Sequence, residues 1–240
     1  LADLGADVIK VENPDGGDQV RATGPFLDGE SSNFVRLNRN KRSLVLDLNN
    51  ADDRARALEL VRTADVVIEN FRPGVMAKFG LDVDSVAALK SDIVYCSLTG
   101  FGAGAGKNLA GYDLLIQAMG GLMSITGSPD GEPTKAGVAL VDVISGLNAF
   151  SGVLLALRNR DAAAATGAPP TPQRLEIDLL TSLLSALSNQ ASAVLNTGAD
   201  PTRMGNAHPS ISPYELYRAA DRPLVIAVGS DRHFALLVQK

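Results

Sequence analysis

The sequence is poor in residues that cross-link a chain or bind metals. Its 240 residues include one cysteine (Cys96), two histidines and no tryptophan. A single cysteine excludes a disulfide framework and a cysteine-based metal site, and His208 and His233 are too few for a histidine-based one. We therefore expect no metal site. A lone thiol also fits a reducing compartment, which predicts a cytoplasmic protein.

Long apolar runs and surplus positive charge are also absent. No uninterrupted apolar run reaches the ~18 residues of a membrane span, so an integral membrane protein and a membrane partner are not expected. The formal net charge is −5, and nucleic-acid binding depends on surplus lysine and arginine, so no nucleic-acid partner is expected either. An anionic ligand would need a local basic cluster.

Several well-known motifs are missing as well. The first β-strand pattern is not followed by G-x-G-x-x-G, and the sequence has no Walker loop and no G-x-S-x-G elbow. What is present is the composition of a globular protein, with 45% hydrophobic and 20% charged residues. The length is sufficient for one large domain, or for one domain and part of another.

Both ends of the sequence have the pattern of an incomplete helix. The chain starts at Leu1 without methionine, and residues 1–6 are typical of the last turn of a helix with Gly5 as its C-cap. Residues 231–240 have the pattern of a helix that has only begun. We therefore expect that both ends are truncated.

The first hundred residues predict an α/β fold. Short β-branched runs alternate with helical patterns, as in sheets built from βαβ units. Carboxylates at Asp52 and Asp53 suit the first turn of the first long helix. The expected strands are 8–12, 43–48, 65–69 and 93–98, and the expected helices are 51–62 and 84–90.

The second part of the chain is more irregular. It has a strand pattern at 174–179 and composition breaks at 161–173 and 196–213, which we interpret as a flexible excursion and a linker. The other expected elements are a glycine-rich loop at 99–106, a helix from about Tyr112, a long apolar helix at 142–158 and a helix at 181–195.

Basic side chains gather at residues 36–42, which read RLNRNKR. Such a run is most often a solvated loop, but in an acidic protein it is also a place where a polyphosphate can bind. Arg21, Arg72 and Lys78 lie near predicted strand ends, and open α/β sheets bind ligands at the carboxyl ends of their strands.

The segment ENFRPG at 69–74 follows a predicted strand directly. It leaves the strand in a Pro-Gly turn and carries an amide, an aromatic ring and a guanidinium, on Asn70, Phe71 and Arg72. An amide and a ring can pair with and stack on a heterocycle. A turn that only reverses the chain remains the alternative.

Asp142 is the strongest single candidate for a catalytic residue. It is the only charged residue between Lys135 and Arg158, and an unpaired ionised carboxylate in apolar surroundings is costly. It is either a helix N-cap or a carboxylate nucleophile, and the two are compatible because a helix N-terminus favours the ionised form. Asp113 alone predicts an N-cap or a first-turn acid.

Taken together, the motifs resemble those of the class III coenzyme A transferases, the group that includes formyl-CoA transferase and carnitine CoA-transferase. The resemblance covers almost the whole chain apart from 161–173. The similar segments, in the family's order, are LADLGADVIKVE (1–12), GDQVR (17–21), LNRNKRSLVLDL (37–48), ENFRPG (69–74), SLTGFG (97–102), AGYD (110–113), MGGLMSITG (119–127) and NAHPSISPY (206–214).

The resemblance implies roles for individual residues. Asp142 matches the nucleophilic aspartate that forms an acyl anhydride and then a CoA thioester, and Asp113 matches a carboxylate near it. CoA and acyl-CoA are implied as substrates, with no permanently bound cofactor. Segment 206–212 resembles the loop that covers the reacting acyl group. Contacts with CoA are implied for Arg21, Asn70, Phe71, Arg72 and Lys78, while a lysine of some members is replaced by Ala110.

The resemblance also implies an architecture. It predicts a large Rossmann-like CoA-binding domain at 1–196, a linker with an active-site loop at 197–213, and the beginning of a small α/β domain at 214–240. Two subunits of the family interlock as linked rings, so a homodimer is expected. The acceptor and donor acids are expected to be dicarboxylates such as succinate.

Two alternatives stay open. The same superfamily contains 2-methylacyl-CoA racemases, whose histidine base falls at the position of Tyr112. A phenol is a poor base near pH 7, and this favours the transferase, in which Tyr112 donates a hydrogen bond to the reacting oxygen. The other alternative is a non-catalytic domain that binds a nucleotide or CoA.

Overall fold

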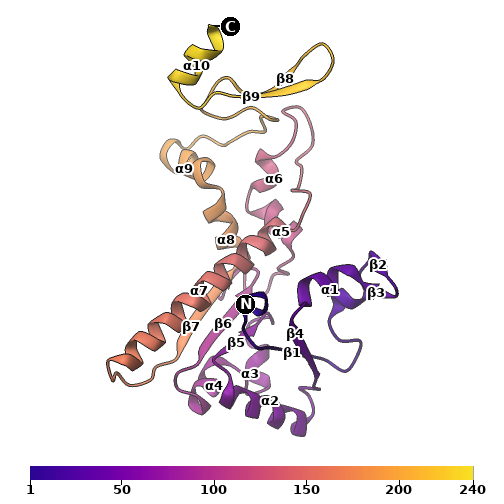
Figure 1. The fold of residues 1–240 in the computed structure, drawn as a ribbon, viewed down its shortest axis with the longest axis vertical. Helices are drawn as coiled ribbons and strands as arrows, with labels where there is room; N and C mark the ends of the chain where they lie inside the picture. The colour runs from indigo at the N-terminus through magenta and orange to yellow at the C-terminus, as the bar shows by residue number, and fades with distance from the viewer. Residues whose placement is uncertain (240) are drawn as a thin grey trace. The chain divides into compact units, whose positions relative to one another are not determined.

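The computed structural model describes residues 1–239, which form two units (Figure 1). Unit 1 consists of Leu1–Thr99 and Leu147–Ile177, and unit 2 consists of Gly100–Gly146 and the chain from Asp178 onward. The domain boundaries expected near residues 196 and 213 stay a prediction.

The first sheet of unit 1 has two parallel strands. Strand β1 (Val8–Glu12) pairs with β4 (Lys41–Val45), with Val8 opposite Lys41 and Glu12 opposite Val45. Before β1 the chain makes a 3-10 helix, η1 (Ala2–Leu4), which ends at Gly5 as the sequence predicts; Gly5 has a φ of 99° in the left-handed region. Between the strands lie η2 (Gln19–Ala22), the antiparallel pair β2 (Phe26–Leu27) and β3 (Glu30–Ser31), and helix α1 (Ser32–Asn38).

The second sheet of unit 1 has the strand order β5-β6-β7, and β5 and β6 are parallel. Asn50 and Asp82 cap helices α2 and α4 by accepting hydrogen bonds from first-turn N–H groups. The elements are α2 (Ala51–Thr63), β5 (Val66–Glu69), α3 (Val75–Lys78), α4 (Val83–Leu89), β6 (Val94–Thr99), α7 (Leu140–Ala165) and β7 (Gln173–Asp178).

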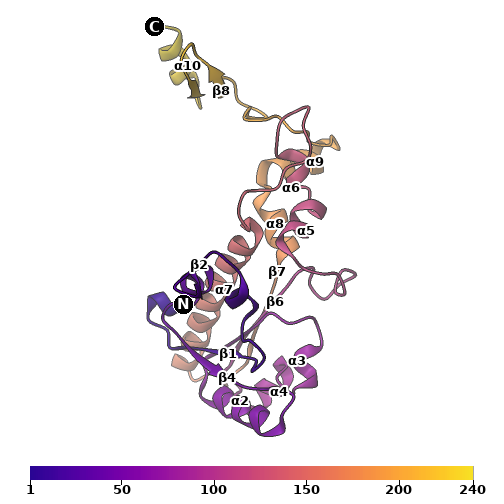
Figure 2. The ribbon, with the colours of Figure 1, turned by 90° about the vertical axis from the view of Figure 1, so that its right-hand side faces the viewer.

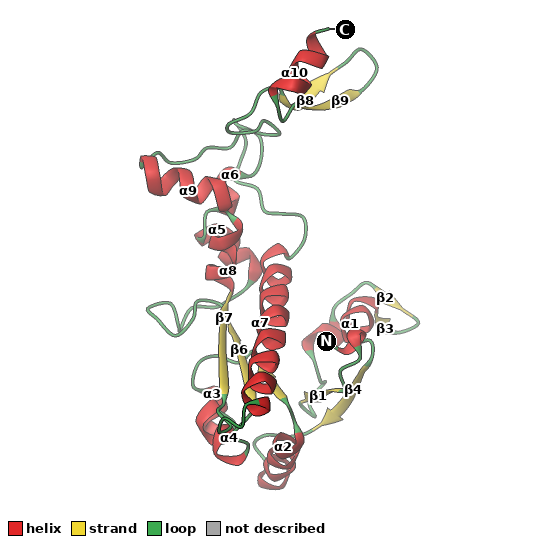
Figure 3. Cartoon of the chain, turned by 60° about the vertical axis from the view of Figure 1, so that its left-hand side comes forward, coloured by secondary structure: helices red, strands yellow, loops and turns green. Residues whose placement is uncertain are grey.

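Strand β6 is buried on both faces. Tyr95 packs in a cluster with Val61 of α2 and Val86 of α4. Its neighbour Cys96 packs with Val153 of α7 in a second cluster, because successive side chains of a strand point to opposite faces. Figures 2 and 3 show α7 alongside β6 and β7, and the two clusters place α2 and α4 on the other face of β6. This layering confirms the predicted α/β class.

Unit 2 is mainly helical. Its core consists of Ile116, Val141, Leu179 and Leu183, from three helices. The chain ends in an antiparallel pair of strands followed by a helix. The elements are α5 (Asp113–Met119), α6 (Leu122–Ile125), α8 (Leu179–Ala186), α9 (Ser188–Thr197), β8 (Tyr214–Arg218), β9 (Pro223–Ala227) and α10 (Asp231–Val238).

Two sequence predictions were wrong in this part of the fold. Residues 161–165 are not a flexible excursion but the last turn of α7, since a run of alanines has the highest helix propensity. The helix expected at 181–195 is two helices, α8 and α9, separated at Leu187. Ser188, the first residue of α9, has a φ of 45°, and a continuous α-helix cannot run through a residue in that left-handed conformation.

Helix α7 bears on the expectation of no membrane span. Among the described residues it is the one helix long and apolar enough to cross a membrane by length and composition, although polar residues interrupt it. Of its most apolar window, 28% is buried inside the structure. The core helix of a soluble protein also meets these criteria, so α7 is only weak evidence of a membrane span. The expectation that the chain has no membrane span stays a prediction.

Candidate active site

Asp142 is the third residue of α7, in its first helical turn. It is therefore not the helix N-cap, which was one of the two roles predicted for it. Asp142 keeps part of its surface exposed to solvent, although neighbouring protein atoms remove some of the water around its carboxylate. Among residues 1–239 no hydrogen bond or ion pair reaches its carboxylate. An exposed carboxylate without a partner is free to act as a nucleophile.

Asp113 caps α7 from another helix. It is the first residue of α5, and its Oδ1 accepts hydrogen bonds from the backbone N–H of Val141 at 2.8 Å and of Asp142 at 3.3 Å. These N–H groups belong to the first turn of α7, where the helix itself supplies no acceptor. Asp113 is thus the first-turn acid that its position predicted, but it also performs the capping that was expected of Asp142.

The two carboxylates influence each other. The pKa of Asp142 is raised, first because burial removes part of its water and second because the negative charge of Asp113 is near. The N-terminus of α7 acts in the opposite direction by favouring the ionised form. A raised pKa makes the ionised carboxylate more basic, and a stronger base is a better nucleophile toward a carbonyl carbon.

Gln117 completes this arrangement, and sequence reasoning missed it. Its side chain is fully buried. Nε2 donates to Asp113 Oδ2 at 2.5 Å, and Oε1 accepts from the N–H of Ala136 at 2.8 Å. The available signal was its spacing, because residues four apart in a helix share a face and Gln117 is the only polar side chain between Leu114 and Met119.

Tyr112 lies directly before this pair as the N-cap residue of α5. Its side chain makes no capping hydrogen bond and is 72% exposed. The sequence prediction that the phenol donates a hydrogen bond to a reacting oxygen is compatible with this exposure. Tyr112, Asp113 and Asp142 all belong to unit 2.

Segment 203–208 belongs to unit 2 as well. The Nε of Arg203 donates to the carbonyl of Ser128 at 3.3 Å, and the N–H of Gly205 donates to the carbonyl of Gly127 at 3.0 Å. His208 Nδ1 accepts from the N–H of Ser210 at 3.0 Å, so a neutral His208 carries its proton on Nε2. Residues 203 and 205, directly before the segment 206–212 that was expected to cover the acyl group, thus attach the chain to the loop after α6. The covering role of 206–212 stays a prediction.

The residues predicted to contact the nucleotide follow β5 in unit 1. Asn70 Nδ2 donates to the carbonyl of Leu98 at 2.7 Å and joins the carboxyl ends of β5 and β6. Phe71, Arg72 and Lys78 are exposed, and among the described residues neither cation has an ion pair. A ring and two free cations at the carboxyl end of a parallel strand suit an anionic heterocyclic ligand.

Arg21 differs from these two cations because its guanidinium already has partners. Its Nε and Nη2 donate to the two oxygens of Glu12 at 2.8 and 2.9 Å, and it lies 3.8 Å above the ring of Phe34. Glu12 is only 4% exposed. Arg21 therefore joins η2 to β1 and α1, and only its remaining N–H groups are available for a phosphate.

Two of the four basic side chains at 36–42 pair with carboxylates. Arg39 binds Asp3 through Nε at 2.8 Å, and Arg42 binds Asp7 through Nε at 3.0 Å. The run is not a loop, because it consists of the end of α1, residues 39–40 and the start of β4. Its exposed ion pairs favour solvated side chains over a polyphosphate site.

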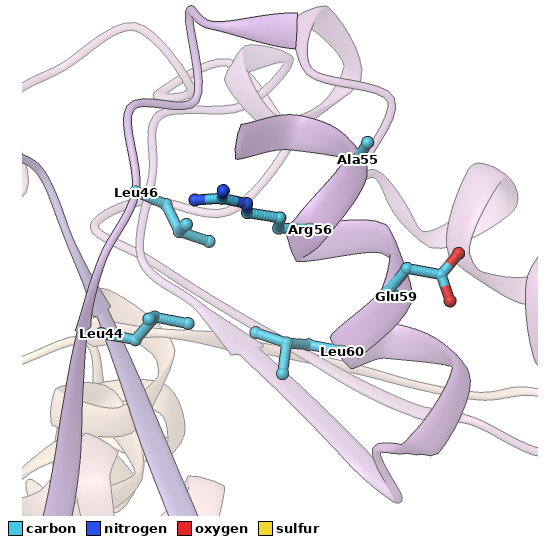
Figure 4. Close-up of a pocket in the computed structure, with 6 residues that line it drawn as sticks. All are labelled: Leu44, Leu46, Ala55, Arg56, Glu59 and Leu60. Carbon is cyan, nitrogen blue, oxygen red and sulfur yellow. The ribbon is translucent and has the colours of Figure 1, made fainter. Parts of the chain in front are cut away.

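The described residues form no other obvious site. No group of three or more His, Cys, Asp or Glu side chains within residues 1–239 is arranged to hold a metal ion. Figure 4 shows a hollow between β4 and α2, which none of the predicted site residues lines. It is lined by Leu44, Leu46, Ala55, Arg56, Glu59 and Leu60.

Comparison with known proteins gives the family of the chain. The model of CoA-transferase family III matches residues 1–240. The chain belongs to CoA-transferase family III. This confirms the resemblance that the sequence motifs indicated.

Two proteins named as CoA-transferases are similar to this chain over nearly its whole length. A succinate–glutarate CoA-transferase of Agrobacterium fabrum is 47% identical over 245 residues, which cover 99% of this chain and 60% of that protein. An acetyl-CoA:oxalate CoA-transferase of Acetobacter aceti is 39% identical, with coverages of 99% and 60%. The chain thus spans about three fifths of the length of these relatives.

A solved structure shows the same fold. The crystal structure of a CAIB/BAIF family protein from Brucella suis has a TM-score of 0.84 and 43% identity to this chain, covering 99% of it and 62% of that protein. The α/β architecture described above is therefore the one found in this family member.

Proposed function

We propose that the protein containing this chain transfers coenzyme A from an acyl-CoA to a free carboxylic acid, with Asp142 as the covalent nucleophile. The observation that supports this most directly is the acid pair at the start of α7. There Asp113 caps the helix, and Asp142 keeps an exposed carboxylate without a partner. Family membership agrees with this activity.

The reaction divides into exchanges between acyl groups and CoA. An oxygen of Asp142 attacks the thioester carbonyl, the C–S bond breaks, and CoA leaves as the thiolate. The thiolate attacks the aspartyl carbonyl of the resulting anhydride, which releases the donor acid and leaves an aspartyl-CoA thioester. The acceptor carboxylate displaces the thiolate again, and the thiolate then attacks the acceptor's carbonyl, which frees Asp142 and yields the new acyl-CoA.

Dicarboxylates are the proposed substrates. The Agrobacterium fabrum relative is named for succinate and glutarate, and two further relatives are named for succinyl-CoA with glutarate and with mesaconate. CoA is then a substrate rather than a resident cofactor. The adenine and phosphates of CoA are proposed to contact Phe71, Asn70, Arg72 and Lys78, with Arg21 beside them.

We also propose a cytoplasmic homodimer whose subunits interlock, without nucleic-acid or membrane partners. Cys96 is a buried free thiol whose pKa is raised to about 11 by burial, and a single cysteine without a disulfide fits a reducing compartment. Exposed apolar side chains on α7, such as Val143, Leu147 and Leu155, favour a further protein surface against this helix. The domain limits at residues 196 and 213 belong to the same proposal.

Trapping the covalent intermediate tests the function. We expect that the intact gene product, incubated with succinyl-CoA and hydroxylamine, carries a hydroxamate on the peptide that contains Asp142. We expect Asp142→Asn to lose transfer to glutarate by a factor of at least about 10³, because a carboxamide cannot form the anhydride.

An exposed carboxylate of the same unit supplies the control. Asp221→Asn removes a charge from the exposed turn between β8 and β9, away from the acid pair, so transfer and trapping should stay as in the wild type. Transfer by Asp142→Asn at a rate comparable to that of the wild type would contradict the nucleophile assignment.

A further inference from the structure

We propose that Gln117 is a positioning residue of the acid pair, whose amide holds Asp113 against the start of α7 and thereby fixes the place of Asp142. This inference rests on the proposed function of Asp142. Gln117 touches no reacting atom in the proposed mechanism, and it acts through Asp113 alone.

The contacts form one continuous chain. The N–H of Ala136 donates to Gln117 Oε1, Gln117 Nε2 donates to Asp113 Oδ2, and Asp113 Oδ1 accepts from the N–H groups of Val141 and Asp142. The network therefore spans the loop before α7, helix α5 and the first turn of α7. Its last link reaches the backbone of the nucleophile itself.

The chemistry of this position requires an amide. A carboxamide offers both a donor and an acceptor, whereas an ionised carboxylate accepts only and an alkyl group does neither. With Gln117 fully buried, either replacement leaves a group inside the protein without its hydrogen bond. A carboxylate would in addition place a second negative charge against Asp113 Oδ2.

The position of Asp113 matters for the reactivity of Asp142 in two ways. Its Oδ1 fixes the backbone of Val141 and Asp142, and its charge is one cause of the raised pKa of Asp142. If Oδ2 loses its donor, the Asp113 carboxylate can rotate away from α7. Both the placement of the nucleophile and its basicity then change.

Few other ionisable groups face this network. Helices α6 and α8 pack against α5, and neither contains a titratable side chain. The ammonium of Lys135 donates to the carbonyl of Ala136 at 3.2 Å. On α5 and the start of α7, the titratable groups are Asp113 and Asp142.

The test uses two variants of Gln117 in the intact gene product. In Gln117→Glu we expect kcat for CoA transfer to fall about tenfold or more at pH 8, with KM for succinyl-CoA changed by less than about threefold. As the pH falls toward 6, kcat relative to the wild type should recover, because the introduced carboxyl gains a proton and can donate again. Gln117→Leu should lose kcat at both pH values.

Gln190→Glu is the matched control, because it adds the same charge on α9, outside the acid-pair network. Its kcat should follow the wild-type pH profile. Thermal unfolding of each variant, together with KM, separates a placement effect from a general loss of folded protein. A Gln117→Glu enzyme with the kcat and pH profile of the wild type would overturn the inference.

A measurement on the wild type keeps the inference testable if the variants do not fold. The side-chain amide hydrogens of Gln117 should exchange with solvent at least about a hundredfold more slowly than those of Gln190. Equal exchange rates would overturn the inference whatever the enzyme does. A failure of the proposed function would give a different result from a failure of this inference. In that case the wild type would not transfer CoA, or Asp142→Asn would transfer CoA at the full rate.

Discussion

Glu12 shows how much of unit 1 depends on a single buried carboxylate. It accepts hydrogen bonds from Arg21 twice, from the hydroxyl of Ser43 at 2.7 Å and from the N–H of Asp18 at 2.9 Å. These contacts join β1, β4 and η2. The pKa of Glu12 is held far below its usual range, first by the Arg21 guanidinium, although burial acts in the opposite direction.

This lowered pKa predicts an acid-sensitive fold. In the unfolded chain Glu12 takes up a proton near pH 4.3, whereas in the folded protein it stays ionised well below that pH. Its contribution to stability is therefore complete above about pH 5 and is lost progressively as the pH falls below about 4. We expect Glu12→Gln to lower the free energy of unfolding by about 2 kcal/mol at pH 7, because the hydrogen bonds to a charged acceptor are lost.

Urea unfolding at pH 7 and at pH 3.5 measures this effect. The difference in the free energy of unfolding between the wild type and Glu12→Gln should be smaller at pH 3.5. Glu59→Gln is the control, because Glu59 pairs with Arg62 on the exposed face of α2 and should change stability by less than about 0.5 kcal/mol. A gap that stays the same at both pH values would contradict the assigned role of Glu12.

At the scale of elements, helix α2 is a case in which local sequence determines the start of a helix. Asn50 Oδ1 accepts from the N–H of Asp52 at 2.8 Å and of Asp53 at 3.3 Å. We expect Asn50→Ala to lower the free energy of unfolding by about 1 kcal/mol, since two first-turn N–H groups lose their acceptor. Asn189→Ala, on the exposed side of α9, should have little effect. Chemical denaturation of both variants makes the comparison, and equal stabilities would refute the capping role.

Local signals of this kind explain which elements the sequence predicted. The strand 8–12 and the helix from 51 were predicted correctly, because alternation and capping residues act within a few positions. The cap of α7 escaped prediction because its acceptor, Asp113, lies 28 residues before Val141. Gln117 escaped for the same reason, since its partner Ala136 is 19 residues away. Contacts of this range depend on how helices pack, which periodicity does not encode.

At the scale of the whole protein, the choice between transferase and racemase depends on position 112. A racemase must remove the α-proton of an acyl thioester, and a phenol at Tyr112 is a poor base for that near neutral pH. In heavy water we therefore expect the intact gene product to move CoA between dicarboxylates without washing deuterium into the α-carbon of a 2-methylacyl-CoA. Mass spectrometry of recovered substrate measures this. Rapid exchange without any CoA transfer would favour the racemase.

The candidate site could be predicted only in part, again for physical reasons. The motifs named Asp142 and Asp113, and the structure brings the backbone of one to the carboxylate of the other. Arg21 was predicted to meet CoA, and no motif showed that Glu12 and Phe34 already occupy most of its guanidinium. The sequence shows which residues are charged, but only the folded structure shows which groups they pair with.

The two-sided burial of β6 has a consequence for how the protein can change over generations. Tyr95 fits against α2 and α4, while Cys96 fits against α7. A change in volume at the first must be compensated from one layer, and a change at the second from the other. Tyr95 and Cys96 should therefore be substituted independently of each other, each together with residues that are distant in the sequence. An alignment of many family members should show two separate sets of covarying positions, each containing one of these two residues.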